Sequence, residues 1–205
     1  MENERLGRII LLNGASSSGK SSIAHALLGL LAAPWFFFPV DALGAMRSTQ
    51  HTRPLDDAEV EAMLRRTRRG YHRAVAALAS AGNDVIMDYP LSEPWRLADL
   101  LEVLETYDVT LVDVLCSPDE LDRREAARRD RPIGLARSQS RVFEHDDRDI
   151  AVDTTATAPD ACARAIVAEL PRITHPKAFE RLRMPAPLRA RSAVEPEVGD
   201  APPAP

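Results

Sequence analysis

One segment near the start of the chain has the residue types of a phosphate-binding loop. Residues 14–21 read G-A-S-S-S-G-K-S and fit the pattern G-x-x-x-x-G-K-[ST] at every position. Gly14 and Gly19 permit turns at which a Cβ would clash. Successive backbone N–H groups can then point at phosphate oxygens, helped by the positive end of the following helix. The pattern predicts that Lys20 reaches the β- and γ-phosphates of a nucleotide and that Ser21 ligates Mg²⁺.

The residues on either side of this loop support the same interpretation. Residues 8–12 form an apolar run of strand length, and the residues from Ser21 onward have the pattern of a helix. Strand, glycine loop and helix in this order is the context that separates a P-loop from a chance match. A chance match would also need one of only two lysines in the chain to fall at the required position. The predicted nucleotide contacts of the loop are Gly14, Ala15, Ser16, Ser17, Ser18, Gly19, Lys20, Ser21 and Ser22.

A carboxylate follows the second predicted strand. The aromatic run 35–40 reads as that strand, and Asp41 comes directly after it, in a position that lies beside the P-loop strand in most such sheets. We predict that Asp41 is catalytic, and that it accepts the proton of an acceptor hydroxyl or binds that hydroxyl. Two other roles stay open, a water-mediated contact to Mg²⁺ and the N-cap of a short helix over 42–47. Phe38 is predicted to pack in the core and to contact the acceptor.

A second carboxylate, Asp88, ends the third predicted strand, which starts at residue 84. The apolar run before it favours a role like that of a Walker B aspartate, which binds Mg²⁺ through its second coordination shell. Asp88 could instead contact the acceptor substrate, or could simply be a polar strand end. Both aspartates are therefore predicted to lie near the phosphates.

A third set of candidates lies on a predicted helix that begins at Asp119. Arg124, Arg128 and Arg131 are spaced at i, i+4 and i+7, so they share one helix face. We predict that Arg124 and Arg128 contact the nucleotide, and that Arg128 and Arg131 are catalytic because they spread positive charge over the transferring phosphoryl group. The alternative is a solvated helix face, paired with Asp122, Glu125 and Asp130.

Short strands alternate with helices along the whole chain. The predicted strands are 8–13, 35–40, 84–88, 109–115 and 150–154, and the predicted helices are 20–32, 56–80, 93–106, from 119, and 159–170. This alternation predicts an α/β fold of the P-loop NTPase type, with a mostly parallel sheet and helices on both faces. Ligands in such sheets bind at the carboxyl ends of the strands, where the candidate residues should converge.

Composition limits the possible partners. The 205 residues suit one domain, over 1–175, and the net charge of −5 provides no basic field for nucleic acid or a membrane. Two cysteines without metal spacing indicate a reduced, cytoplasmic setting, and the apolar run near the N-terminus is too short for a signal peptide. The last 35 residues hold eight of the 16 prolines, so we expect a proline-rich tail over 176–205, disordered from about residue 185.

The remaining motifs narrow the class of P-loop protein. A guanine-reading N-K-x-D is absent, because the only lysine besides Lys20 is Lys177. Tyr89 follows Asp88 where many motor ATPases have glutamate. A compact kinase of small molecules fits what remains, since it needs a P-loop, a carboxylate beside the acceptor hydroxyl, and arginines over the phosphates. His145, in an acidic stretch, is predicted to be a surface residue.

The chain resembles the chloramphenicol phosphotransferase-like kinases over about residues 8–170. The resemblance lies in the N-G-x-S-S-x-G-K-S pattern, in Pro34-Trp35 followed by aromatic residues and Val40-Asp41, and in R-E-x-x-R-x-D-R over 124–131. It continues through Gly134, Gln139, His145 and residues 152–155.

This resemblance implies a five-stranded parallel sheet like that of nucleoside and shikimate kinases. It also implies ATP- and Mg²⁺-dependent phosphorylation of a hydroxyl on an amphenicol antibiotic, with resistance by inactivation as the consequence. The family's base falls on Asp41, and its lid arginines fall on Arg124, Arg128 and Arg131. Two alternatives stay open, a metabolic kinase with another alcohol as acceptor, and a non-enzymatic nucleotide switch that recruits a protein partner.

Overall fold

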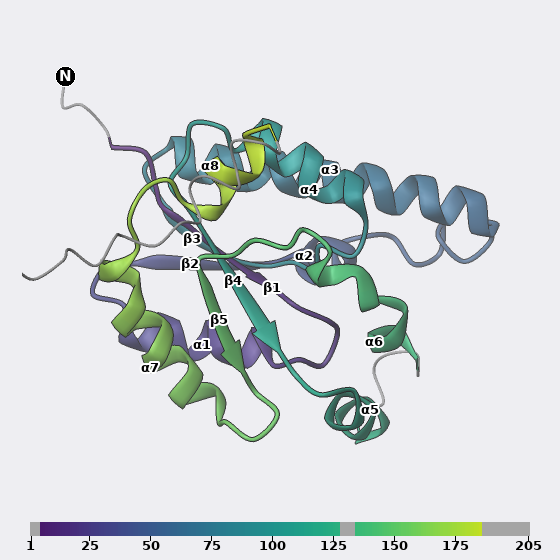
Figure 1. The fold of residues 1–205 in the computed structure, drawn as a ribbon. Helices are drawn as coiled ribbons and strands as arrows, with labels where there is room; N and C mark the ends of the chain where they lie inside the picture. The colour runs from purple at the N-terminus through teal and green to yellow at the C-terminus, as the bar shows by residue number, and fades with distance from the viewer. Residues whose placement is uncertain (1–4, 128–133, 186–205) are drawn as a thin grey trace, which may run out of the picture.

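The chain folds around one five-stranded parallel sheet (Figure 1). A computed structural model describes residues 5–127 and 134–185. The strands are β1 (Ile9–Asn13), β2 (Trp35–Pro39), β3 (Asp84–Asp88), β4 (Val109–Leu115) and β5 (Ile150–Asp153), in the spatial order β2-β3-β1-β4-β5. Every neighbouring pair is parallel, which confirms the predicted fold class.

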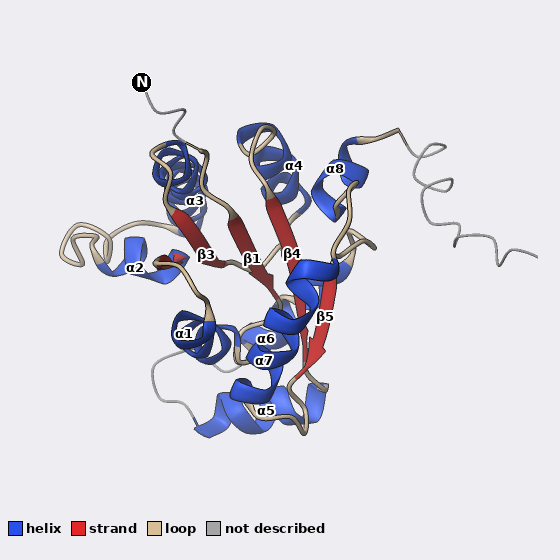
Figure 2. Ribbon diagram, turned by 90° about the vertical axis from the view of Figure 1, so that its left-hand side faces the viewer, coloured by secondary structure: helices blue, strands red, loops and turns tan. Residues whose placement is uncertain are grey.

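Helices cover both faces of the sheet (Figure 2). Helices α3, α4 and α8 pack on one face, and α1 and α7 pack on the other. The helices are α1 (Lys20–Leu30), α2 (Val40–Ala45), α3 (Asp57–Ser80), α4 (Pro94–Val103), α5 (Pro118–Ala127), α6 (Leu135–Ser138), α7 (Pro159–Glu169) and α8 (Ala178–Arg183), with short 3₁₀ turns at Ser140–Phe143 and Leu170–Arg172. In the described part of the chain, no helix combines the length and apolar character needed to cross a membrane.

The apolar run of β1 is explained by its central position. Successive side chains of a strand point to opposite faces, so a strand covered on both sides is apolar at every position. Ile9 and Leu11 pack under α3 and α4, whereas Ile10 and Leu12 pack against α1 and α7. All five residues of β1 are buried, so the P-loop that follows starts from a rigid support.

The long helix α3 begins at a capping box. The carboxylate of Asp56 accepts a hydrogen bond from the backbone N–H of Glu59 at 2.8 Å, and Glu59 accepts one from the backbone of Asp56 at 3.0 Å. Such a cap stabilises a helix by about 1 kcal/mol. The helix ends before Gly82, whose φ of 85° belongs to the left-handed region that favours glycine.

Strand β2 is not beside β1, contrary to the sequence prediction. Among the described strands it pairs only with β3, from Trp35 opposite Asp84 to Pro39 opposite Asp88, and so it forms one edge of the sheet. The residues explain this position. Pro39 lacks an N–H for a second neighbour, and the Phe36 side chain is half exposed. Strand β3 is buried over its first four residues and takes the inner place.

The predicted boundary of the C-terminal tail is wrong. The sequence prediction began the tail at residue 176, but α8 packs on the sheet, with Phe179 and Leu182 buried in the core beneath α3 and α4. The backbone N–H of Ala178 also donates to Asp149 at 2.7 Å. The folded domain therefore extends at least to Arg183. The rest of the predicted tail, from residue 186, lies outside the described residues.

Candidate active site

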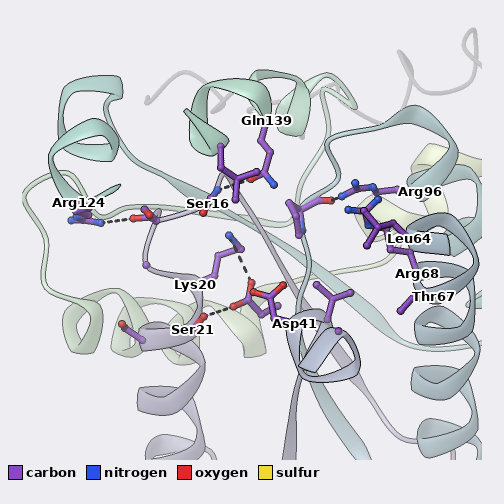
Figure 3. A pocket seen from close by; sticks show the side chains of 18 of the residues that line it. Ser16, Lys20, Ser21, Asp41, Leu64, Thr67, Arg68, Arg96, Arg124 and Gln139 are labelled. Carbon is purple, nitrogen blue, oxygen red and sulfur yellow. Dashed lines mark hydrogen bonds and ion pairs between the residues drawn. The ribbon is translucent and has the colours of Figure 1, made fainter. Parts of the chain in front are cut away.

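A cavity of about 980 Å³ opens at the carboxyl ends of the strands. Figure 3 shows its two sides facing each other, with the P-loop on one side and α3 on the other. We call the first side the nucleotide half; it comprises Ser16, Ser17, Gly19, Lys20, Ser21, Ser22, Asp88, Arg123, Arg124 and Gln139. We call the second side the acceptor half; it comprises Val40, Asp41, Gly44, Arg47, Leu64, Thr67, Arg68, Pro90 and Arg96.

The backbone of the P-loop has the conformation that its glycines permit. A Cβ on Gly14 would lie 2.6 Å from the carbonyl oxygen of Val114 on β4, closer than real Cβ atoms approach. Gly19 has a φ of 95°, and Ser17 has a φ of 64°, an uncommon value for a residue with a side chain. The loop is thus pressed against β4, with its backbone shaped by close approach and by left-handed turns.

Lys20 is held across the loop that precedes it. Its ammonium group donates to the carbonyl oxygens of Gly14 and Ala15, at 2.9 and 2.8 Å, and lies 3.7 Å from a carboxylate oxygen of Asp88. The Lys20 side chain is only 7% exposed, so its charge acts in a poorly solvated place. The role of Lys20 at the phosphates of a nucleotide stays a prediction.

Ser21 and Asp88 are joined directly. The hydroxyl of Ser21 donates to Asp88 at 2.5 Å, which brings together the two residues that the sequence assigned to the metal. Within residues 5–127 and 134–185, no group of three or more His, Cys, Asp or Glu side chains could hold a metal ion. A Mg²⁺ ion at this site would therefore rely on the Ser21 hydroxyl, on phosphate oxygens and on water, which is how Mg²⁺ is commonly bound beside nucleotides.

The side chains and backbone of the loop serines have different surroundings. The hydroxyls of Ser17 and Ser18 are buried, and neither has a hydrogen-bond partner among the described residues. The backbone N–H of Ser16 donates to the side-chain oxygen of Gln139 at 2.6 Å. Gln139 was noted in the sequence only as part of the family pattern, not as a site residue. It lies just after α6, more than a hundred positions from the P-loop, so no local signal predicts this contact.

Arg124 on α5 braces the loop. Its guanidinium donates to the carbonyl oxygens of Ser17, at 3.4 Å, and Thr154, at 2.6 Å, and also to the Thr154 hydroxyl at 3.1 Å. Among the described residues its acidic partner is Glu120, at 2.7 Å, and not Asp122 or Glu125 of the solvated-face alternative. Arg124 lines the cavity, so it can both fix the loop and meet a nucleotide there.

The other predicted arginines of this region, Arg128 and Arg131, lie outside the described residues, as does Asp130. The two remaining acidic candidates have separate partners. Glu125 is buried and accepts from the backbone N–H groups of Gly134 and Ala136, which ties α5 to α6. Asp122 pairs with Arg137.

Asp41 lies in the acceptor half, in the first turn of α2. The N-cap of α2 is Pro39, so the alternative of Asp41 as N-cap is wrong. Phe38 does not line the cavity. Its ring packs 5.1 Å from that of Tyr71, whose hydroxyl donates to the Phe38 carbonyl oxygen at 2.5 Å. The structure therefore supports the core role of Phe38 and not the predicted acceptor contact.

The acceptor half also contains three arginines that the sequence prediction missed, Arg47, Arg68 and Arg96. Arginines are frequent over residues 65–73 of α3, and two of them, Arg69 and Arg73, lie on an exposed face of the helix and pair with Asp99 on α4. Arg68 is next to Arg69 in sequence but reaches the cavity instead. Periodicity alone could not separate these two faces of α3.

A buried polar network supports the sheet behind the P-loop. The amide of Asn13, the last residue of β1, donates to Asp113 on β4 at 2.8 Å and lies 3.0 Å from His145. The Asn13 oxygen accepts from the backbone N–H of Leu91 at 2.9 Å. The His145 side chain is 3% exposed, so the prediction of a surface histidine is wrong. The prediction rested on the acidic residues next to His145 in the sequence, which do not determine whether the His145 side chain itself is buried.

Taken together, a P-loop after the central strand, a lysine across it, a Ser–Asp pair and a facing carboxylate define the class of the P-loop kinases. Solved structures agree with this class at the level of the fold. The chain resembles an adenosine phosphosulfate (APS) kinase from Mycobacterium tuberculosis, with a TM-score of 0.61 and 19% identity over 82% of this chain and 99% of that one. It also resembles a gluconokinase from Sinorhizobium meliloti, with a TM-score of 0.58 and 22% identity over 82% of this chain and 94% of that one.

Sequence comparison identifies the family. The model of the chloramphenicol phosphotransferase-like proteins matches residues 7–171. A protein of Mycobacterium tuberculosis that is provisionally named an O-phosphotransferase is 33% identical over 201 residues, which cover 86% of this chain and 88% of that protein. The chain belongs to the chloramphenicol phosphotransferase-like family, which confirms the resemblance found in the sequence and makes it a phosphotransferase that uses a hydroxyl group as acceptor.

Proposed function

We propose that this protein transfers the γ-phosphoryl group of ATP to an alcohol that binds in the acceptor half of the cavity. The observation that carries the proposal is that Lys20 and Asp41 line the same cavity. A nucleotide switch would need the P-loop but would have no use for a second carboxylate in that cavity that could receive the proton of an acceptor. A kinase would use both residues.

The P-loop would bind the phosphates through its backbone N–H groups. Lys20 would neutralise charge on the β- and γ-phosphates, and Arg124 would keep the loop in place. Ser21, oriented by Asp88, would hold Mg²⁺, whose charge would offset the negative charge of the phosphates. Each of these residues acts on charge that grows as the phosphoryl group is transferred.

Asp41 would act on the acceptor. An alcohol is a weak nucleophile at neutral pH, so transfer gains from a base that receives its proton. The acceptor oxygen forms a bond to the γ-phosphorus, the bond to the bridging oxygen of ADP breaks, and the hydroxyl proton passes to the Asp41 carboxylate. The products are ADP and a phosphate ester. The carboxylate also orients the hydroxyl before the transfer.

Two classes of acceptor are candidates. The family description favours chloramphenicol or a related antibiotic, in which case the reaction would inactivate the drug and give resistance. The second candidate is another small alcohol of metabolism. It is favoured by a specific observation, the three arginines that line the acceptor half.

Acceptor-dependent turnover tests the proposal. The protein is incubated with ATP, Mg²⁺ and a panel of alcohols that includes chloramphenicol, and the products are examined by mass spectrometry for the gain of one phosphoryl group. We expect phosphorylated acceptor and ADP in equal amounts, and neither with Lys20→Ala. ATP turnover that responds to no alcohol, but rises with a protein partner, would favour the nucleotide switch instead.

A further inference from the structure

The acceptor half is unusually rich in positive charge. Arg47, Arg68 and Arg96 reach it from three separate segments, the chain after α2, helix α3 and helix α4. Figure 3 shows Arg68 and Arg96 close together, on the side of the cavity opposite Lys20 and Ser21. Because these arginines come from three separate segments, their proximity is not a consequence of the spacing of residues along one helix.

Arg96 is the fixed member of the set. Its side chain is 5% exposed, and its guanidinium donates to the carbonyl oxygen of Pro90 at 2.8 Å and to the carboxylate of Glu93. It also lies over the Tyr89 ring, 5.6 Å from its centre. Its Nε is buried and has no hydrogen-bond partner among the described residues. Arg96 is thus oriented by the protein but retains one buried donor.

Arg68 is poorly neutralised. Its side chain is 25% exposed, and its salt bridge within the described part of the chain is a long one of 3.6 Å to Glu93, the same carboxylate that Arg96 uses. Burial lowers the pKa of the Arg68 guanidinium, and the positive charge of Arg96 lowers it further. Asp41 and Glu93 act in the opposite direction without cancelling this effect. The Arg68–Arg96 pair is therefore a place where an additional negative charge would be stabilised.

Arg47 adds a third guanidinium. It donates to the hydroxyl of Thr67 on α3 at 2.8 Å, and no carboxylate in the described part of the chain forms a salt bridge with it. By contrast, two other arginines of α3, Arg69 and Arg73, both form salt bridges with Asp99. Among the described residues, the acceptor half therefore holds three guanidinium groups and one carboxylate, that of Asp41. Glu93, which contacts Arg68 and Arg96, does not line the cavity.

We propose that Arg47, Arg68 and Arg96 form an anion subsite, and that the natural acceptor is an alcohol that also carries a carboxylate or a phosphate monoester. This inference rests on the proposed kinase function and names its class of substrate. A guanidinium presents two parallel donors that match a carboxylate or a phosphate. A neutral acceptor would cover these cations and leave them without a counter-charge, which is costly in a poorly solvated place.

Paired acceptors test this directly. One arm uses small hydroxy acids, each beside its methyl ester, and a second arm uses hydroxyl-bearing phosphate monoesters, each beside the alcohol without the phosphate. Chloramphenicol is included as a neutral acceptor. We expect the anionic member of a pair to have a kcat/KM about 100-fold or more above its neutral partner. The arm in which this occurs identifies the anion. Equal use of both members, or preferred use of chloramphenicol, would overturn the anion subsite while leaving the kinase function intact.

A binding measurement tests the anion subsite even if the panel does not contain the natural acceptor. The full chain is loaded with a non-hydrolysable ATP analogue and Mg²⁺, so that the P-loop is filled, and inorganic sulfate and inorganic phosphate are titrated by calorimetry. We expect one anion to bind, and both Arg47→Gln and Arg68→Gln to weaken it by about tenfold or more. Arg66→Gln is the matched control, because Arg66 is an exposed arginine of the same helix that does not line the cavity.

The outcomes are separable. Lack of anion binding to the loaded protein, or equal binding by all three variants, would overturn the subsite. Failure of the ATP analogue to bind at all would instead contradict the kinase function. Circular dichroism and melting temperatures of the variants show whether a loss of binding reflects a loss of fold. Arg96 is left unchanged in these tests because its bonds to Pro90 and Glu93 also hold the chain after β3.

Discussion

The two halves of the cavity differ in how firmly the fold holds them. In the nucleotide half, Ser16 and Lys20 are buried; the backbone N–H of Ser16 donates to the Gln139 side chain, and the Lys20 ammonium group donates to a backbone carbonyl oxygen of the loop. In the acceptor half, α2 has no buried residue, and Asp41 is exposed. Phosphate groups are the same in every nucleotide, so a rigid backbone cradle suits them. Acceptors differ between kinases, and a loosely packed wall can change without disturbing the sheet.

The largest effect should come from the nucleotide half. Lys20→Ala removes the cation that lies across the P-loop, and with it the charge that offsets the transferring phosphoryl group. We expect turnover to fall by about 10³-fold or more. Steady-state kinetics with saturating acceptor measures this, and circular dichroism checks that the fold survives. Turnover close to that of the unmodified protein would show that the loop has lost its chemical role.

The next effect should come from the acceptor half. Asp41→Asn keeps the size of the side chain and can still hydrogen-bond a hydroxyl, but it cannot accept its proton. Turnover of the acceptor should fall by about 10²–10⁴-fold. Nucleotide binding should be retained, because the P-loop provides it. The measurements are kcat with acceptor and the Kd of ATP by calorimetry.

Asp88→Asn is the control that separates the two halves. Asp88 is bonded to Ser21, so its loss should impair slow ATP hydrolysis and phosphoryl transfer together. Asp41→Asn should impair transfer much more than hydrolysis. If instead Asp41→Asn abolishes binding of Mg·ATP, Asp41 belongs to the metal site, and the roles of the two aspartates must be exchanged.

The same contrast explains how far the sequence could predict the site. The P-loop residues of the nucleotide half lie in one short sequence pattern, so a single segment contains both the glycines of the turn and the lysine and serine predicted to act on the nucleotide. Strand β1 could be recognised because burial on both faces makes every residue apolar. Gln139, by contrast, reaches Ser16 only through the tertiary fold.

The acceptor half could not be derived in this way. Arg47, Arg68 and Arg96 come from three segments of the chain, and only the tertiary fold brings them to one cavity. The position of β2 at the sheet edge was also missed, because the apolar run 35–40 does not show which neighbour it pairs with. Likewise, the proline content near the C-terminus hid the apolar face of α8, in which Phe179 and Leu182 are buried.

A smaller effect is expected from an aspartate that stabilises the sheet but lies away from the cavity. Strand β3 has an aspartate at each end, and Asp84 at its start is bonded to Arg8 and Arg5 rather than to the cavity. Burial alone would raise the pKa of Asp84, but the hydrogen bonds from Arg8 and Arg5 outweigh it and lower the pKa to about 2. A lowered pKa contributes stability above the unfolded value of 3.8, and this contribution is lost as the pH falls towards 2.

Asp84→Asn should therefore lower the free energy of unfolding at pH 7 by about 2 kcal/mol and flatten its dependence on pH between about 4 and 2. Urea unfolding at several pH values measures both changes. Because Asp84 lies at the opposite end of β3 from the cavity, kcat and the Kd of ATP should stay unchanged under conditions where the variant is folded. A variant with normal stability would mean that the two arginines contribute nothing through this carboxylate.

The smallest effect concerns a glycine of the acceptor half. A Cβ built on Gly44 in α2 meets no atom within 4 Å, whereas one on Gly14 in the P-loop would meet the Val114 carbonyl oxygen at 2.6 Å. Gly44 is helical, so Gly44→Ala should reduce the freedom of the unfolded chain and raise the free energy of unfolding by about 0.5–1 kcal/mol. Urea unfolding measures the gain, and the Kd of ATP should not change, because residues 14–22 are untouched. A loss of stability, or weaker nucleotide binding, would show that α2 is packed as closely as the P-loop and that the two halves do not differ as described.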